Sequence, residues 1–185
     1  MWPDFDFSKA FDTVSHVKWS EKFKAVSLTG NLLKWIMDFL GGRTQRTRVG
    51  AAYSEAIAMA SGIVQLSCIG PILFVIYVVC FDMEVVCSLY ANDIKLYTYI
   101  RSFSDCSRLQ LAINCLVSWA IKSQLRISIN KCMVSHVGNN NTPPYTYSIQ
   151  SLSLPNVVTA VQDLGVMFDV KLKFNVHINK IVVTA

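Results

Sequence analysis

The sequence predicts an α+β fold, in which an antiparallel sheet packs against helices. The first observation is Tyr90-Ala91-Asn92-Asp93, which lies between two apolar stretches and is typical of a hairpin turn with acidic groups at its tip. The second is the segment 4–7, which has the pattern of a strand. The third is a set of apolar residues at helical spacing, namely Leu109, Ile113, Leu116 and Ala120.

The N-terminal half alternates between strand and helix signals. Pro3 cannot donate to a sheet ladder, so we expect the strand 4–7 not to extend cleanly upstream. A helix is expected over 16–25. Another opens at Gly30 and carries apolar residues on one face until Gly41-Gly42 stops it. The segment 47–60 suggests a hairpin with its turn near Gly50.

The C-terminal half continues the same alternation. A Gly-Pro step at 70–71 precedes an apolar helix expected over about 72–80. Asp105 is expected to cap the next helix. Strands are expected over 125–137 and 163–169, with a loop at 139–144 between them.

Composition bounds the fold and excludes a membrane protein. The 185 residues suit one domain or a piece of a larger one, and the 52% of hydrophobic residues exceeds the usual share for a soluble domain. We therefore expect either a deep core or uncovered apolar surface that favours self-association. The longest apolar run, 69–81, is interrupted by Gly-Pro and is shorter than the roughly 20 residues of a membrane span. No signal peptide is visible.

The cysteines indicate an intracellular location, in the cytoplasm and/or nucleus, whereas the charge bears on the binding partner. The net charge of +5 fits a nucleic-acid partner without establishing one. Arg43, Arg46 and Arg48 form the densest basic stretch, either as a solvated loop or as phosphate contacts. None of the six cysteines forms a Cys-x-x-Cys pair, and we expect reduced, buried thiols. The cysteines are Cys68, Cys80, Cys87, Cys106, Cys115 and Cys132.

Acidic residues far apart in the sequence occur at predicted strand ends. Asp6 and Asp12 form a cluster near the start, and Asp93 ends the hairpin tip. Carboxylates that converge from separate strands are what a two-metal phosphoryl-transfer site needs. Asn92 stands beside Asp93, and an amide holds Mg²⁺ less well than a carboxylate does.

The order of these segments resembles the palm of reverse transcriptases from non-LTR (LINE-type, jockey-like) retrotransposons. The segment 6–16, DFSKAFDTVSH, is similar to the first palm motif, and 61–71, SGIVQLSCIGP, is similar to the second, SGxPQGSxLGP. The segment 90–93 resembles the YADD box. The fourth segment is matched around Trp119 to Cys132, and the fifth around Asp163 to Val166. The match covers nearly the whole chain.

This resemblance implies an RNA-directed DNA polymerase palm, an antiparallel sheet of three or four strands with helices on one face. It implies a palm core over about 4–137 and a fifth segment with the primer grip over about 145–185, with fingers and thumb largely absent. It implies two Mg²⁺ (or Mn²⁺) ions, a dNTP, an RNA template and a DNA primer. The implied roles are metal binding for Asp6 and Asp93, nucleotide binding for Phe7, Phe11 (a steric gate), Gln65 and Lys131, and nucleic-acid contact for Tyr90, Leu164, Gly165 and the three arginines.

Three positions depart from the family pattern. Asn92 replaces a metal-binding aspartate of the catalytic set, Val64 replaces proline, and Leu66 replaces glycine. A missing carboxylate weakens metal affinity, so we expect weak or no catalysis. The alternatives are a palm that binds nucleic acid without catalysis, and a relic with no role.

Overall fold

The structure is a computed structural model that describes residues 2–78, 85–138, 143–157 and 160–184. It divides into two compact units. The first unit comprises residues 1–7, 83–118 and 127–185, and the second comprises residues 8–82 and 119–126.

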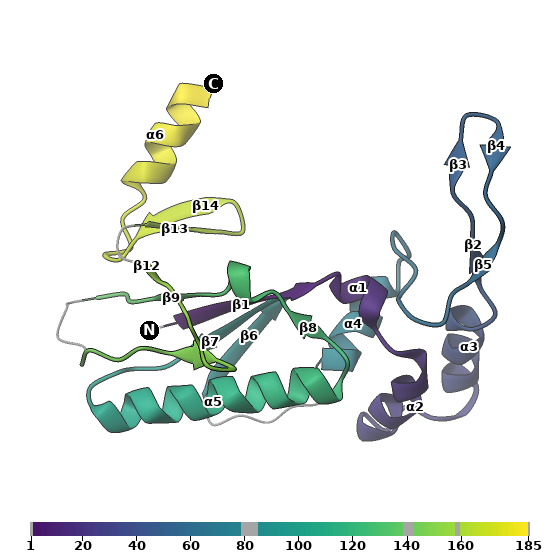
Figure 1. Cartoon of the computed structure of the whole chain (residues 1–185), viewed down its shortest axis with the longest axis horizontal. Helices are drawn as coiled ribbons and strands as arrows, with labels where there is room; N and C mark the ends of the chain where they lie inside the picture. The colour runs from purple at the N-terminus through teal and green to yellow at the C-terminus, as the bar shows by residue number, and fades with distance from the viewer. Residues whose placement is uncertain (1, 79–84, 139–142, 158–159, 185) are drawn as a thin grey trace. The chain divides into compact units, whose positions relative to one another are not determined.

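A mixed sheet forms the centre of the first unit (Figure 1). In the described residues it has six strands in the order β12-β9-β1-β7-β6, with β8 paired to β1. All the neighbours along that order are antiparallel except β12 and β9, which are parallel. The strands are β1 (Trp2–Ser8), β6 (Val86–Tyr90), β7 (Asp93–Tyr97), β8 (Arg126–Ile127), β9 (Met133–Ser135) and β12 (Asn156–Val157).

Smaller elements surround this sheet in the first unit. Two hairpins, one helical turn and two helices complete it. These are β10 (Ser148–Ile149) with β11 (Leu152–Ser153), β13 (Ala160–Asp163) with β14 (Val166–Asp169), η1 (Ile129–Lys131), α5 (Phe103–Lys122, which continues into the second unit) and α6 (Asn175–Thr184).

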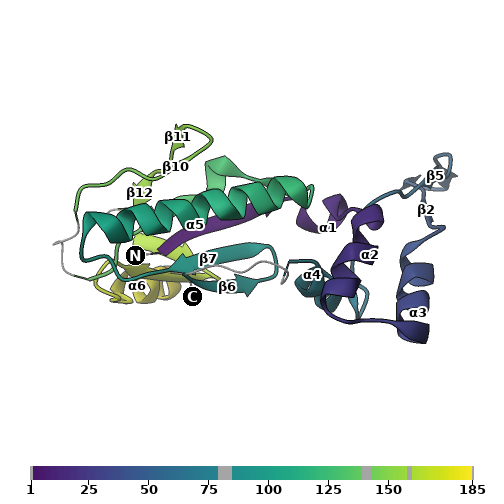
Figure 2. The ribbon, with the colours of Figure 1, turned by 90° about the horizontal axis from the view of Figure 1, so that it is seen from below.

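The two faces of the central sheet differ in polarity because side chains alternate along each strand. Phe5, Ile94, Leu96 and Val134 are buried on one face. Helix α5 lies along the sheet (Figure 2) and buries a stripe that includes Leu109. Asp4, Asp6, Asp93 and Lys95 alternate with those apolar residues and share the opposite face.

The second unit combines short helices with a long hairpin. Its core includes Trp19, which stacks on Phe23 and meets the Tyr77 ring edge-on. Its elements are α1 (Ala10–Thr13), α2 (His16–Ala25), α3 (Gly30–Leu40), β2 (Thr44–Gln45), β3 (Arg48–Val49), β4 (Ala52–Tyr53), β5 (Ile57–Ala58) and α4 (Gly70–Val78). The predicted helices 16–25 and 30–40 and the hairpin turn near Gly50 are confirmed.

Four sequence-based expectations about secondary structure need correction. The first strand runs through Pro3, because its partner on β9, Val134, donates its N–H to Pro155 and the β1–β9 ladder needs no N–H from Pro3; the register with β7 begins only at Asp4. The segment 125–137 is two short strands separated by η1. The segment 163–169 is not one strand, because it holds the last residue of β13, the turn at Leu164-Gly165 and β14. Asp105 is not the N-cap but lies in the first turn of α5, where its carboxylate accepts the N–H of Ser102.

The expectations about the sheet and about the cysteines are confirmed only in part. The antiparallel pairing is present, but the sheet described has more strands than the three or four expected. Cys106 and Cys132 are buried thiols, whereas Cys68, Cys87 and Cys115 are exposed. Cys80 and most of the predicted loop 139–144 lie outside the described residues. Among the described helices, none is both long and apolar enough to cross a membrane.

Candidate functional site

A groove on the polar face of the central sheet brings together acidic residues from distant parts of the sequence. Asp6 of β1 is the register partner of Asp93, the first residue of β7. The groove has a volume of about 180 Å³. Its lining residues are Asp4, Phe5, Asp6, Asp93, Lys95, Lys131, Met133, Gln162, Asp163 and Leu164.

Both carboxylate oxygens of Asp6 accept hydrogen bonds from neighbouring side chains. The Asn92 side-chain amide donates to Oδ1. The Lys131 ammonium donates to Oδ2 at 2.5 Å. Asn92 reaches Asp6 because the β6–β7 turn places it beside the β1–β7 ladder, and η1 brings Lys131 to the same carboxylate. The protein itself therefore supplies donors to the carboxylate that the family resemblance assigns to metal.

Six charged side chains determine the electrostatics of the groove: the carboxylates of Asp4, Asp6, Asp93 and Asp163 and the ammonium groups of Lys95 and Lys131. Burial raises the pKa of Asp93, and the nearby Asp6 charge adds to that rise. The hydrogen bond to Asp6 and the charge of Asp6 raise the pKa of Lys131. When all six groups are ionised, the groove keeps two negative charges, which balance one divalent ion and not two.

Lys95 is the most enclosed charged group of the groove, whereas sequence reasoning offered it only as a nucleic-acid contact in the alternative without catalysis. Only 7% of this residue is exposed, although it is a lysine in a strand. Its ammonium lies 3.6 Å from Asp4 and forms a closer ion pair with Asp163. Burial lowers the pKa of Lys95, but the hydrogen bond to Asp163 and the charges of Asp4 and Asp163 outweigh burial and raise it overall. Its alternation with Ile94 and Leu96 on β7 is the signal that could have placed it with the acids.

The Asp93→Asn variant is expected to be more stable than the unaltered chain at neutral pH. A carboxyl whose pKa is raised on folding stabilises the fold below its ordinary value of 3.8, and that stabilisation is lost as pH rises through the folded pKa. Urea unfolding should therefore show a gain at pH 7 that disappears near pH 4. Asp38→Asn, on the exposed face of α3, controls for charge removal alone. An equal gain at both pH values would contradict this cause.

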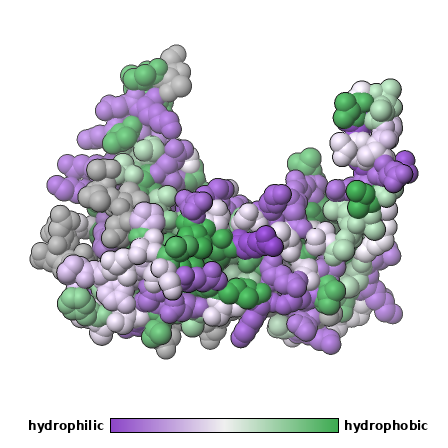
Figure 3. All heavy atoms as spheres, in the orientation of Figure 1, coloured by the Kyte–Doolittle hydropathy of each residue, from purple (hydrophilic) through white to green (hydrophobic). Residues whose placement is uncertain are grey.

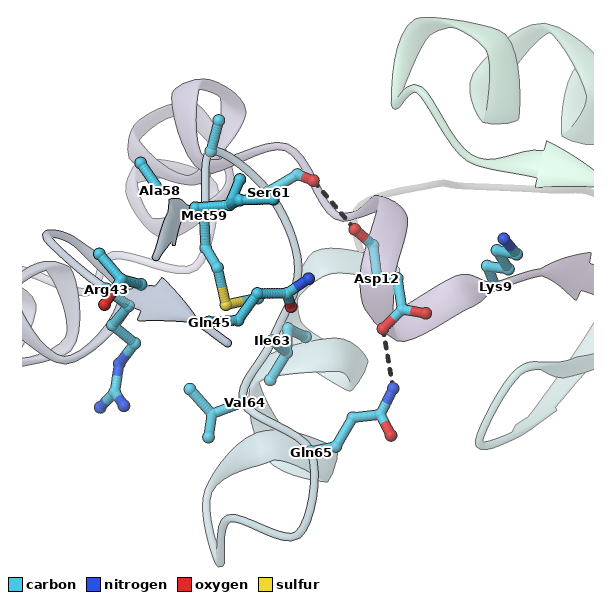
Figure 4. Close-up of a pocket in the computed structure, with 13 residues that line it drawn as sticks. Lys9, Asp12, Arg43, Gln45, Ala58, Met59, Ser61, Ile63, Val64 and Gln65 are labelled. Carbon is cyan, nitrogen blue, oxygen red and sulfur yellow. Dashed lines mark hydrogen bonds between the residues drawn. The ribbon is translucent and has the colours of Figure 1, made fainter. Parts of the chain in front are cut away.

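The second unit holds a larger hollow, of about 960 Å³, beside the segment that resembles the second palm motif (Figure 4). Gln65 donates its side-chain amide to Asp12 Oδ1 at 2.8 Å, and the Ser61 hydroxyl donates to the Asp12 carbonyl at 3.0 Å. Phe11 stacks on Phe74 with ring centroids 4.8 Å apart. The first and second motifs are thus bonded to each other within this unit.

Leu66 adopts a backbone conformation that favours glycine. Its φ is +61°, in the left-handed region, and its side chain is fully exposed. The family pattern has glycine at this position, so the structure supplies a physical reason for that glycine. Leu66 therefore carries backbone strain next to Gln65.

The three arginines lie on or next to the β2–β5 hairpin, where hydrophilic and hydrophobic side chains are mixed (Figure 3). Arg46 and Arg48 are exposed, and the Arg48 guanidinium lies 5.4 Å from the centre of the Tyr53 ring. Arg43 is half-buried, donates to the Phe39 carbonyl and covers the Phe39 ring. Arg43 thus contributes to the end of α3, while the other two present charge to solvent.

The remaining candidate residues differ in how they relate to the groove. Leu164 lines it, and Gly165 shares the exposed β13–β14 turn. Tyr90 is exposed at the end of β6, opposite Asp93 in the ladder. The Phe7 side chain is buried in the core, and its N–H donates to the Asn92 carbonyl at 3.4 Å. The role of the Phe7 N–H toward a triphosphate stays a prediction.

The residues of the groove do not fit the two-ion arrangement that the resemblance implies. Asp6 and Asp93 offer the hard oxygen ligands that Mg²⁺ prefers. However, both Asp6 oxygens already accept from Asn92 and Lys131. The described residues also contain no group of three or more acids, histidines or cysteines placed to hold a metal ion.

Comparison with known proteins gives a consistent family match. Residues 2–168 match the family described as "Reverse transcriptase (RNA-dependent DNA polymerase)". The chain is 27% identical over 191 residues to the "RNA-directed DNA polymerase from mobile element jockey" of Drosophila funebris, covering 95% of this chain and 20% of that protein. It is 26% identical over 193 residues to the "Probable RNA-directed DNA polymerase from transposon X-element" of Drosophila melanogaster, with the same coverage. The chain thus spans about a fifth of the length of these relatives.

Proposed function

Because the chain belongs to the reverse transcriptase (RNA-dependent DNA polymerase) family, we propose that it is the palm region of an RNA-directed DNA polymerase from a non-LTR retrotransposon. The register of β1 and β7 carries this proposal, since it pairs Asp6 with Asp93 on one polar face. The substrates are a dNTP, an RNA template and a DNA primer. The reaction is attack of the primer 3′-hydroxyl on the α-phosphate of the dNTP, with loss of pyrophosphate.

The resemblance to the family motifs assigns roles in this reaction to residues of the chain. Asp6 and Asp93 would hold a divalent ion, Mg²⁺ or Mn²⁺, which supplies charge neutralisation at the phosphates. Lys131, whose side chain is 67% exposed, would contact phosphate oxygens or give a proton to the leaving pyrophosphate. Leu164 and Gly165 would contact the primer at the edge of the groove. Phe11 would exclude a ribose 2′-hydroxyl, and Gln65 would lie beside the nucleotide.

Catalysis by this chain is proposed to be weak or absent. Asn92 removes one carboxylate and donates to a second, so the site has less charge for metal than the family pattern provides. Leu66 adds a side chain and backbone strain beside Gln65.

Primer extension tests this proposal. The unaltered chain is expected to give little or no product on an RNA template with Mg²⁺ or Mn²⁺. With fingers and thumb supplied, the double variant Asn92→Asp, Leu66→Gly is expected to gain extension, and adding Asp93→Asn should abolish the gain. Efficient extension by the unaltered chain would contradict the assigned effect of Asn92. A double variant that binds primer–template but never extends it would contradict the assignment of the loss to these two sites.

A second candidate function is binding of nucleic acid without catalysis. The observation that favours it is the hairpin with exposed Arg46 and Arg48 beside Tyr53, since arginine contacts phosphate and tyrosine can stack on bases. We also propose that the chain self-associates through exposed apolar side chains. A further proposal is that it is intracellular. A relic without any role would show neither binding nor catalysis.

Replacing the two exposed arginines, Arg46 and Arg48, with alanine is expected to weaken binding to an RNA–DNA hybrid by at least tenfold at low salt. The slope of log affinity against log salt should fall by about one for each phosphate that the variant no longer neutralises. Fluorescence anisotropy at several salt concentrations measures both quantities. The control removes two exposed lysines elsewhere, Lys24 and Lys34. If both double variants lose affinity equally, net charge and not the hairpin is responsible.

A further inference from the structure

The buried cation Lys95 connects the central sheet to the β13–β14 hairpin. Its ammonium is shared between Asp4 on β1 and Asp163, the last residue of β13. Asp163 directly precedes the Leu164-Gly165 turn, where φ is +45° at Leu164 and +87° at Gly165. The ion pair therefore ends at the turn that lines the groove of Asp6 and Asp93.

We infer that Lys95 is a positioning residue, whose paired ammonium holds the Leu164-Gly165 turn against the groove that contains Asp6 and Asp93. This inference deepens the proposed function, because it assigns the residue that sets where the primer contact lies. A lysine this enclosed is unfavourable unless it is paired, so Asp163 cannot move away without leaving a buried charge with one partner fewer.

The other attachments of the hairpin explain why this ion pair controls only its tip. Val161 and Phe168 are buried and pair with each other across the two strands. The Gly138 N–H donates to the Val170 carbonyl at 2.9 Å, just beyond the end of β14. These contacts secure the base and middle of the hairpin, whereas Asp163 secures the residue at the turn.

Hydrogen exchange on the full chain tests the inference without any need for catalysis. Lys95→Met is expected to speed exchange by at least tenfold at residues 163–166, the turn end of the peptide 160–169, and Lys95→Arg should stay near the unaltered rate. Asp163→Asn should match Lys95→Met, and the double variant should add nothing, since both remove one pair. Lys131→Met, which removes the other groove lysine, should leave this peptide unchanged.

Two outcomes would overturn the inference. One is an unchanged exchange rate for 160–169 in Lys95→Met. The other is an equal loss of protection in β1 and β7, which would mean that Lys95 only supports the sheet.

A second measurement uses a primer–template with a fluorescent base at the primer 3′ end. Lys95→Met should change the signal of that base at unchanged overall affinity. If the unaltered chain binds no primer–template, the proposed function fails while the exchange result still stands.

Discussion

Asn92→Asp is expected to raise the affinity of the chain for Mn²⁺ by about tenfold to a hundredfold, equivalent to ~1.4–2.8 kcal/mol. In the present structure the Asn92 amide donates to Asp6 Oδ1. The variant replaces that donor with a carboxylate, so Asp6, residue 92 and Asp93 together would offer three acidic ligands. Titration with Mn²⁺ followed by electron paramagnetic resonance measures the affinity directly.

The same substitution should make thermal stability depend on metal. Without a cation, the new carboxylate repels Asp6 and the melting temperature should fall. Adding Mn²⁺ should reverse the fall, because an ion that binds only the folded state stabilises it. The control is Asn114→Asp, an equal change on the exposed face of α5, which should alter neither property. If Asn92→Asp and Asn114→Asp have the same Mn²⁺ affinity, Asn92 is not what limits metal binding.

The acidic pair could be predicted from sequence because it depends on local signals. The hairpin tip at 90–93 and the strand at 4–7 are both visible in the alternation of apolar and polar residues. In an antiparallel ladder, a polar residue faces a polar residue when the register keeps the apolar face buried. Asp6 and Asp93 are register partners for that reason.

The two lysines of the groove show where sequence reasoning stops. Lys131 reaches Asp6 because a helical turn, η1, interrupts what looks like one strand over 125–137. Lys95 becomes buried because Asp163 arrives from a hairpin near the C-terminus, a contact that no periodicity encodes. Gly165 is a sequence signal for the turn at 164–165, because glycine favours positive φ. Leu164 also has positive φ, which leucine rarely adopts, so the sequence pattern did not indicate a turn there.

Gly62→Ala is expected to lower the free energy of unfolding of the second unit by about 2–4 kcal/mol. Gly62 has φ of +93°, outside the range that side chains tolerate well. A Cβ there would lie 3.1 Å from the Asp12 carbonyl oxygen and 3.2 Å from that of Phe11. Both atoms are backbone, so the neighbours cannot rotate away. Gly62 also donates its N–H to Val14 at 2.8 Å and accepts from His16 Nε2 at 2.7 Å.

Gly50→Ala separates backbone strain from close approach in this prediction. Gly50 also has positive φ, +61°, but a Cβ there meets no atom within 4 Å. It should therefore cost only about 1 kcal/mol, the penalty for a left-handed conformation. Urea unfolding of both variants gives the comparison, and equal losses would contradict the contact with residues 11 and 12. Gln65 is bonded to Asp12, so a displacement of Asp12 in Gly62→Ala should also move Gln65. The absence of a side chain at Gly62 therefore allows the segments that resemble the first and second palm motifs to pack closely.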